Sequence, residues 1–205
     1  LLGLTPEDIS YVLMTHMHHD HSGGLTKLNE NHQLVSTFPN AKIFVNDIEW
    51  YEMMNPNNRT KGTYLRENWE PIQHQVETFT EYLNVIPEIQ MVHTGGHSNG
   101  HSIILLKQGN ETMIHMADLL LTHAHRKPVW VAAVDDYPMR SIIAKEKWLK
   151  EAFENHYKFF FYHDQFFAVV EFDHEGKEIV DYVKRIREPR LPFTDKQDRK
   201  PVLYH

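Results

Sequence analysis

The sequence predicts a single α/β domain whose strands and helices pack as a layered sandwich. The chain has 205 residues, of which 41% are hydrophobic and 24% charged, a composition typical of a globular domain with a sizeable core. Short apolar runs with the length of buried strands alternate with segments of helical spacing. Clusters of histidine and acidic residues follow several of these runs, where a rigid scaffold usually presents catalytic groups. We assign residues 1–186 to this domain and residues 187–205 to an extended C-terminal tail.

The first 54 residues contain two strand-like runs, each followed by polar residues that begin a turn or a helix. Thr5 precedes Pro6, and this pair indicates a helix start because proline suits the first helical position. Gly23 and Gly24 let the chain turn into a helix, and Asn46 can cap another. In order, the predicted elements are a helix start at 5–8, a strand at 11–15, a helix from residue 25, a strand at 41–45 and a helix at 47–54.

Residues 55–85 are polar and aromatic, and their spacing predicts a helical insertion that lies over one face of the sandwich. Strand-like runs return from residue 89, and Gly109 marks a turn between two of them. Pro138 starts a long helix. The predicted elements of this part are strands at 89–94, 102–107 and 112–117, a helix at 139–155, and strands at 158–162, 166–172 and 177–184.

The run from His16 to His21 is the main functional signal. Side chains two positions apart in an extended segment point to the same side, so His16 and His18 can hold one metal ion. Asp20 and His21 follow after a turn and can reach a second ion. Imidazole and carboxylate ligands suit zinc, manganese, iron or cobalt, whereas calcium and magnesium prefer oxygen ligands alone. Taken by itself, the run also fits a solvated histidine-rich loop.

Three further residues lie where predicted strands end. His97 lies in a glycine-lined turn, Asp118 follows the strand at 112–117, and His163 follows the strand at 158–162. Each alone has an ordinary explanation as a polar residue at the end of a strand. Four such clusters in one small domain predict a metal centre at one end of the strands.

Taken in order, these four clusters resemble the motifs of the metallo-β-lactamase superfamily, and the resemblance spans residues 10–165. It implies an αββα sandwich with two divalent metal ions at one edge of its two sheets. Zinc is the expected metal, and manganese, iron and cobalt are alternatives. The implied ligands are His16, His18 and His97 for one ion, Asp20, His21 and His163 for the other, and Asp118 as the bridge between them.

Three local segments make the resemblance more specific. Residues 12–18, 94–98 and 122–125 are similar to YtnP-type quorum-quenching lactonases and, more broadly, to N-acylhomoserine lactonases and methyl parathion hydrolases. The resemblance implies that a metal-activated hydroxide opens the lactone ring of an N-acylhomoserine lactone. A phosphotriesterase or another ester hydrolase is the alternative, because the same hydroxide can attack phosphorus or carbon.

The resemblance also implies catalytic roles for Asp20 and Asp118. Asp20 would carry a proton to the leaving oxygen, and Asp118 would hold the two ions around a shared water. Several N-acylhomoserine lactonases have a tyrosine three residues after the bridging aspartate, but Leu121 occupies that place here. We therefore expect His123 to orient the substrate carbonyl.

Members of this family normally carry several strands before the first histidine motif, whereas this chain starts about fifteen residues before it. We therefore expect the first sheet to lack part of its N-terminal strands. An exposed sheet edge favours pairing with a second copy, so a homodimer is one expectation. The alternative of a different class is a catalytically impaired fragment or a binding scaffold that kept the fold.

The composition excludes several other functions. The absence of cysteine excludes disulfides and thiolate metal ligands, including those of cysteine-using β-lactamases, and fits a cytoplasmic protein. A net charge of −7 argues against a nucleic-acid partner, which needs a basic surface. No apolar run approaches the ~18 residues of a membrane span, and residues 1–15 show no signal-peptide pattern. The expected partner is therefore a small lactone or ester substrate, with no membrane association.

Overall fold

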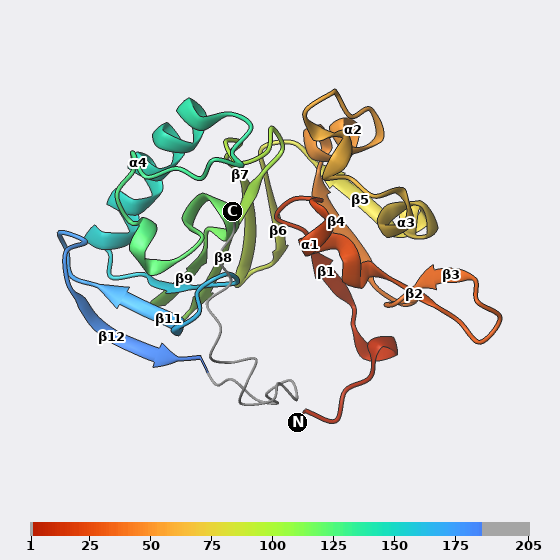
Figure 1. Ribbon diagram of the computed structural model, residues 1–205. Helices are drawn as coiled ribbons and strands as arrows, with labels where there is room; N and C mark the ends of the chain where they lie inside the picture. The colour runs from red at the N-terminus through yellow and green to blue at the C-terminus, as the bar shows by residue number, and fades with distance from the viewer. Residues whose placement is uncertain (1, 186–205) are drawn as a thin grey trace, which may run out of the picture.

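The computed structural model describes residues 2–185, which form two sheets and a small hairpin, with helices on both outer sides (Figure 1). The helices are α1 (His19–Ser22), α2 (Asp47–Met54), α3 (Arg66–Trp69) and α4 (Pro138–Glu154), with 3-10 turns at Pro6–Asp8, Gly23–Leu25, Thr60–Gly62, Glu70–Gln75, Ala117–Leu120 and His123–His125. The strands are β1 (Tyr11–Leu13), β2 (Thr26–Leu28), β3 (Leu34–Ser36), β4 (Lys42–Asn46), β5 (Val76–Phe79), β6 (Tyr82–Ile86), β7 (Ile89–His93), β8 (Ser102–Gln108), β9 (Glu111–His115), β10 (Lys158–Phe160), β11 (Phe167–Phe172) and β12 (Ile179–Lys184).

The smaller sheet consists of three parallel strands in the order β1-β4-β5. Side chains alternate along the central strand β4, so Ile43 and Val45 face one side and Phe44 faces the other. All three are buried, as expected for a strand that is covered on both faces. The helix α2 follows β4 directly, because the Asn46 Oδ1 accepts the backbone N–H of Ile48 at 3.0 Å and caps its first turn.

The larger sheet has seven strands in the order β12-β11-β10-β9-β8-β7-β6. Neighbouring strands are antiparallel except β9 and β10, which run parallel. Parallel neighbours need a long connection, and the chain between β9 and β10 contains α4. In β8, Ile103 and Leu105 face α4, whereas Ile104 and Leu106 face the smaller sheet.

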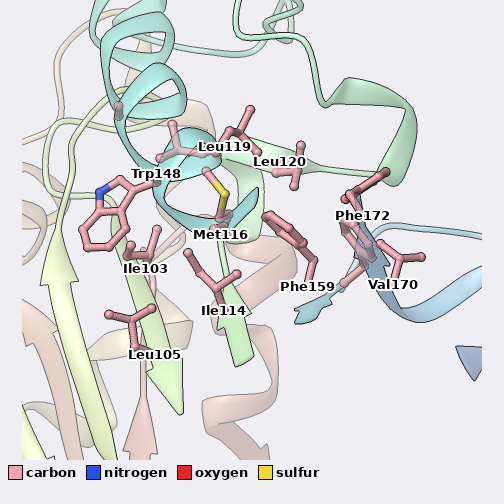
Figure 2. Packing of buried hydrophobic residues seen from close by; sticks show 14 residues of the cluster. Ile103, Leu105, Ile114, Met116, Leu119, Leu120, Trp148, Phe159, Val170 and Phe172 are labelled. Carbon is pink, nitrogen blue, oxygen red and sulfur yellow. The ribbon is translucent and has the colours of Figure 1, made fainter. Parts of the chain in front are cut away.

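Three hydrophobic clusters fill the three interfaces between four layers. The first lies between α4 and the larger sheet, where Trp148 of α4 packs over Ile103 and Met116 (Figure 2). Phe159 is fully buried in the same cluster, and such a side chain contributes roughly 1.5–3 kcal/mol. The second lies between the two sheets and contains Phe44, Phe79, Met91 and Ile104. The third lies between the smaller sheet and the segment from α2 to β5, and contains Ile43, Val45, Met53, Tyr64 and Ile72.

The fold is therefore the αββα sandwich that the motifs implied, and Figure 1 shows α4 on one side of the sheets and α2 and α3 on the other. The structure confirms the predicted strands around residues 11–15, 41–45, 89–94, 102–107 and 112–117, and the three C-terminal strands. It also confirms the helices at 47–54 and 139–155. The helix at 47–54 begins at the Asn46 cap, and the long helix begins at Pro138.

The helix predicted from Leu25 is wrong. The helical turns lie before it, at 19–25, and Thr26–Leu28 is a strand that pairs antiparallel with Leu34–Ser36. The connection is closed by Asn29, whose Oδ1 accepts the backbone N–H groups of Asn31 and Gln33 at 2.9 Å each. An asparagine that folds its side chain onto the following backbone favours a turn over a helix.

The helical interpretation of residues 55–85 holds only as far as Gln75. Short helical turns occupy 60–75, but Val76–Phe79 and Tyr82–Ile86 are strands. The first pairs with β4 in the smaller sheet and the second with β7 in the larger one. Tertiary pairing thus overrides a local pattern that suited a helix. Whether residues 55–75 are an insertion stays a prediction.

The tail predicted at 187–205 lies outside the described residues. Among residues 2–185, no helix is long and apolar enough to cross a membrane.

Candidate metal centre

The ends of several strands bring the predicted ligands together at one end of the molecule. His16 and His18 follow β1, and the short helix α1 contains Asp20 and His21. His97 lies in the connection between β7 and β8. Asp118 lies in the 3-10 turn after β9, and His163 follows β10. The side chains that come together are His16, His18, Asp20, His21, His97, Asp118 and His163.

Three of these histidines form a buried group: His16, His18 and His97. Their ligand-type nitrogens lie within 4.8 Å of one another. The Nε2 of His97 is 3.0 Å from the Nδ1 of His18, so the two rings direct nitrogen atoms at the same point. Such a convergence of imidazole nitrogens can hold one metal ion.

A second, open group consists of Asp20, His21 and His163. The Nε2 atoms of the two histidines are 3.2 Å apart. The Oδ2 atom of Asp20 lies 3.5 Å from the Nε2 atom of His21 and 3.6 Å from the Nε2 atom of His163. The Asp20 side chain is 45% exposed and that of His163 32% exposed. Asp20 and His163 therefore face solvent, whereas the His21 side chain is 8% exposed and lies at the inner side of the group.

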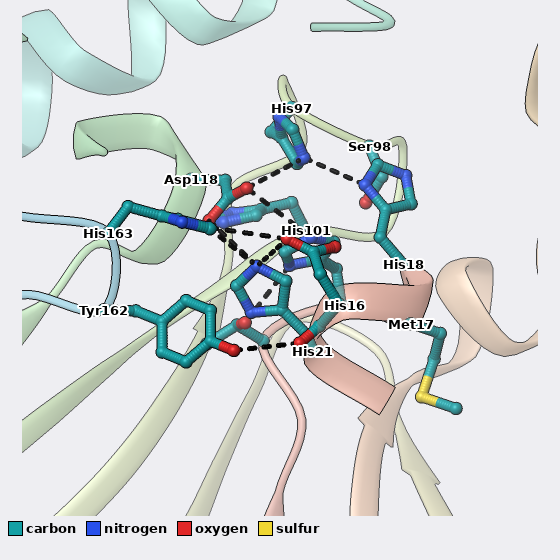
Figure 3. Close-up of polar contacts among 12 residues, drawn as sticks. His16, Met17, His18, His21, His97, Ser98, His101, Asp118, Tyr162 and His163 are labelled. Carbon is teal, nitrogen blue, oxygen red and sulfur yellow. Dashed lines mark hydrogen bonds and ion pairs between the residues drawn. The ribbon is translucent and has the colours of Figure 1, made fainter. Parts of the chain in front are cut away.

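The Asp118 carboxylate lies between the two groups (Figure 3). Its Oδ2 is 3.3 Å from His97 Nε2 and 3.9 Å from His16 Nε2. Its Oδ1 is 3.2 Å from His21 Nε2 and 3.3 Å from His163 Nε2. One oxygen faces each group, which is the arrangement that a carboxylate bridging two ions requires.

The electrostatics of the metal-free protein suit cation binding. Burial lowers the pKa of His16 well below its ordinary value and that of His18 to about 4, so both rings are neutral at pH 7 and offer lone pairs. Burial alone would raise the pKa of Asp118, but the close rings of His163 and His21 outweigh it and keep this pKa far below its usual range. The nearby Asp118 carboxylate raises the pKa of His163.

Three buried atoms of the proposed ligands form no hydrogen bond of good geometry among the described residues: His16 Nε2, His18 Nε2 and Asp118 Oδ1. Buried polar atoms are nearly always paired, so atoms left over in this way call for a partner. All three are imidazole nitrogens or carboxylate oxygens, the atom types that transition metals bind. The residues present therefore fit divalent metal ions.

The loop that carries His97 is held by close packing and by a carboxylate. Gly96 has a φ of +103°, and a Cβ there would come within 2.8 Å of the Ser141 Cα atom, so this position needs glycine. His97 Nδ1 is 2.9 Å from the Oδ1 of buried Asp135. A carboxylate on the second nitrogen fixes the orientation of a metal-binding ring.

His123 does not contact the two groups through any hydrogen bond or ion pair in the described part of the chain. Its Nδ1 is 2.5 Å from the Oδ2 of Asp164, and its backbone N–H donates to the same oxygen at 2.8 Å. The ring also packs edge-on against Phe167. Asp164 thus holds His123 next to the chain segment that carries His163.

Sequence reasoning missed the acidic residues that hold the site. Asp135, Asp164 and Glu49 are all buried, and their partners lie far away in the sequence. Tyr162 was also missed: its hydroxyl donates to the backbone oxygen of Asp20 at 2.9 Å, and its ring packs on His21. The one local signal was that Tyr162 and Asp164 flank a histidine at a strand end.

Two further histidines, His19 and His101, are not proposed ligands. His19 is exposed. His101 is completely buried, with Nδ1 3.0 Å from the hydroxyl of Thr94, so it braces the His97 loop from behind.

The sequence model of the metallo-β-lactamase superfamily matches residues 1–160. The chain belongs to the metallo-β-lactamase superfamily. A probable metal-dependent hydrolase from Staphylococcus aureus has a similar structure, with 41% identity and a TM-score of 0.85 over 89% of this chain and 65% of that one. AidC, a dizinc quorum-quenching lactonase, has a TM-score of 0.73 over 90% of this chain and 67% of its own, and at 19% identity this likeness shows the fold alone.

Curated relatives match about half of this chain. An N-acyl homoserine lactonase from Bacillus cereus is 30% identical over 112 residues, which are 52% of this chain and 36% of the relative. The lactonase AttM from Rhizobium radiobacter is 28% identical over 115 residues, 53% of this chain and 40% of the relative. The matches thus span well under half the length of these relatives. These relatives are named as lactonases, and the similar Staphylococcus aureus structure is named as a probable metal-dependent hydrolase.

Proposed function

We propose that this chain forms the catalytic centre of a dinuclear-metal hydrolase that opens the lactone ring of N-acylhomoserine lactones. The observation that carries the proposal is the position of the Asp118 carboxylate, whose oxygens face two separate groups of ligand-type side chains. A carboxylate that presents one oxygen to each group suits two ions that share it. Two ions would be held within reach of one another.

The buried group would hold one ion and the open group the other, with Asp118 shared between them. The donors are imidazoles and carboxylates only, since the chain has no cysteine. We propose zinc, whose usual coordination number suits such ligand sets, while manganese, iron and cobalt accept the same donors. When bound, the two ions would activate a water at neutral pH and polarise the substrate carbonyl.

Asp20 is the residue to which we assign proton transfer. Its side chain is 45% exposed and lies at the solvent side of the open group, so a substrate can reach it. As water adds to the lactone carbonyl carbon, a carboxylate oxygen of Asp20 would take the proton of the water. It would then pass this proton to the ring oxygen as the carbon–oxygen bond breaks, which gives the open-chain acid.

His123 is the residue that we propose orients the substrate carbonyl. The Asp164 carboxylate holds its Nδ1 edge, which fixes the ring and leaves the Nε2 edge for another partner. The side chain is 24% exposed, so this edge is accessible. With Nδ1–H donated to Asp164, the imidazolium form of the ring would donate Nε2–H to the carbonyl oxygen and so serve the purpose of the tyrosine that Leu121 replaces.

The substrate class rests on the relatives. Proteins named N-acyl homoserine lactonase match 52–53% of this chain at 26–30% identity. The ring-opening chemistry also suits the site, because it needs an activated water and a proton carrier close to each other. A small-molecule substrate, a homodimer and a cytoplasmic location remain predictions from the sequence.

The test combines metal analysis with paired activity assays on the purified chain. We expect about two transition-metal ions per chain after reconstitution, and turnover of a series of N-acylhomoserine lactones that exceeds turnover of a phosphotriester. Faster turnover of the phosphotriester would replace the lactonase proposal with a phosphotriesterase. A protein that binds no transition metal after reconstitution would contradict the hydrolase proposal and favour a binding scaffold.

A further inference from the structure

Glu49 of α2 is a completely buried carboxylate that lies behind the buried group of histidines. Its Oε1 accepts the backbone N–H of Met17 at 2.8 Å and the hydroxyl of Tyr64 at 3.1 Å. Its Oε2 accepts the hydroxyl of Ser98 at 2.5 Å. None of these three partners is a proposed metal ligand.

These hydrogen bonds join the two chain segments that supply the buried group. Met17 lies between His16 and His18 in the sequence, and Ser98 directly follows His97. The Met17 side chain points away from the histidines, so its backbone N–H is free to contact Glu49 (Figure 3). The carboxylate therefore reaches each ligand segment through a neighbour of the ligand, not through the ligand itself.

The loop that carries His97 lies in close contact with the start of α2. A Cβ at Gly100 would lie 2.1 Å from the backbone nitrogen of Glu49, so only glycine lets the His97 loop lie against the start of α2. The ring of Tyr64 also packs 5.4 Å from that of His18, measured between centroids. Glu49 is thus enclosed by elements that carry the site.

The charge of Glu49 has no cationic partner among the described residues. Its oxygens can accept hydrogen bonds from all three partners, as an ionised carboxylate does, whereas burial raises the pKa of this carboxyl and so disfavours its charged form. In that part of the chain, no lysine or arginine forms an ion pair with it. A buried anion without a cation is strongly unfavourable, so a cation nearby would stabilise it.

We propose that Glu49 is the counter-charge and the positioning residue of the ion in the buried group. The three histidines of that group carry no negative charge, and Asp118 is shared with the open group, so one buried carboxylate behind them offsets part of the charge of a divalent ion. The same residue holds the two ligand segments in register. This inference rests on the metal centre of the proposed function.

The test is Glu49→Gln, measured by metal titration and by thermal unfolding of the metal-free and metal-loaded full chain. Glutamine has the same shape: its oxygen can accept from Met17 and Tyr64, and its amide can donate to the Ser98 hydroxyl. The affinity of the tighter-bound zinc ion should fall about 10- to 100-fold, as for other groups that support metal ligands. The metal-free variant should melt at the same temperature as the wild type or higher, because an unpaired buried charge is gone.

Two control variants separate charge from hydrogen bonding. Glu52→Gln removes a carboxylate one turn further along α2 that is partly exposed and bonded to Asn99, so its metal affinity should stay within about twofold because water screens that charge. Tyr64→Phe keeps the Glu49 charge but removes one donor. It should lower the melting temperature of the metal-free protein and change the metal affinity far less than Glu49→Gln does.

Three outcomes would overturn the inference. An unchanged zinc affinity in Glu49→Gln would remove the counter-charge role. Loss of affinity together with a lower melting temperature, or failure of the metal-free variant to fold, would show a purely structural role. An effect of Glu52→Gln equal to that of Glu49→Gln would show general electrostatics. Wild-type protein that binds no zinc would instead contradict the proposed function itself, so the two failures are distinguishable.

Discussion

The two halves of the candidate metal centre have similar donor atoms but very different surroundings. His16, His18 and His97 of the buried group are 0%, 7% and 1% exposed. In the open group, the Asp20 and His163 side chains are 45% and 32% exposed, and only His21, at 8%, is enclosed. Two carboxylates hydrogen-bond to the buried group or its chain segments: Glu49 to the backbone of Met17, and Asp135 to His97. In the open group, the side chains contact one another, and Tyr162 donates a hydrogen bond to the backbone of Asp20.

This difference in exposure suggests a different role for each group of ligands. A group enclosed by protein and fixed by hydrogen bonds keeps its geometry whether or not substrate is present. A group that faces solvent can accept a substrate oxygen and exchange protons with it. We infer that the buried half retains its ion and that the open half is where substrate reacts.

The largest expected effect comes from Asp118→Ala, because this residue serves both halves. The variant should bind fewer than two ions per chain, and lactone turnover should fall by more than about 1,000-fold, which corresponds to about 4 kcal/mol in the barrier. Metal content by elemental analysis and steady-state kinetics measure both. Full activity of a metal-replete variant would refute the bridging role.

Asp20→Asn should lower turnover through the open group and leave the ion of the buried group in place. Asparagine keeps the shape of the side chain but cannot carry the proton, so turnover should fall by about 10²- to 10⁴-fold, the usual range for a lost general acid–base. The buried group does not contain Asp20, so at least one ion should remain bound. Kinetics and metal analysis on the same sample test this. A variant that loses both ions would show that the halves depend on each other.

The sequence predicted much of the site because its ligands belong to local patterns. His16, His18 and Asp20 alternate at the end of a strand, and His97 follows two glycines. The residues that brace the buried group have no such pattern. Glu49 lies 32 residues from Met17, and Asp135 lies 38 residues from His97, so only the folded chain brings these partners together.

The same reasoning applies to the fold. The sequence predicted the strands whose side chains alternate or form a continuous buried run, such as Lys42–Asn46 and Ser102–Gln108. It missed Val76–Phe79 and Tyr82–Ile86, because their polar and aromatic residues also suit a helix and only pairing with β4 and β7 decides the outcome. Local signals fail where long-range pairing determines the structure.

Acid should destabilise the metal-free protein through the buried half. Burial lowers the pKa of His16 and His101 well below the usual value and that of His18 to about 4. Unfolded histidine binds a proton below about pH 6.5. The folded rings stay neutral, so stability falls as the pH drops from about 6.5 toward 4, by at most about 3 kcal/mol between pH 6.5 and 5.5 for three rings.

The open half should not add to this loss. Asp118 raises the pKa of His163, and the stability linked to a raised pKa is fully present at low pH and is lost only as the pH rises. Urea unfolding of the metal-free protein at the two pH values measures the effect. His101→Asn should reduce the pH dependence by about one proton without removing a proposed ligand. Equal stability at pH 6.5 and 5.5 would contradict the prediction.

Tyr162→Phe should have the smallest effect, confined to the open half. The variant loses one hydrogen bond, from the phenol to the backbone oxygen of Asp20, but keeps the ring that packs on His21. One such bond contributes about 1 kcal/mol, so turnover or the affinity of the more weakly bound ion should change by about fivefold. The affinity of the tightly bound ion should stay the same, because no hydrogen bond joins Tyr162 to the described residues of the buried group. Zinc titration that resolves two binding steps tests this, and a change in the tight step would show that the two halves are coupled through α1.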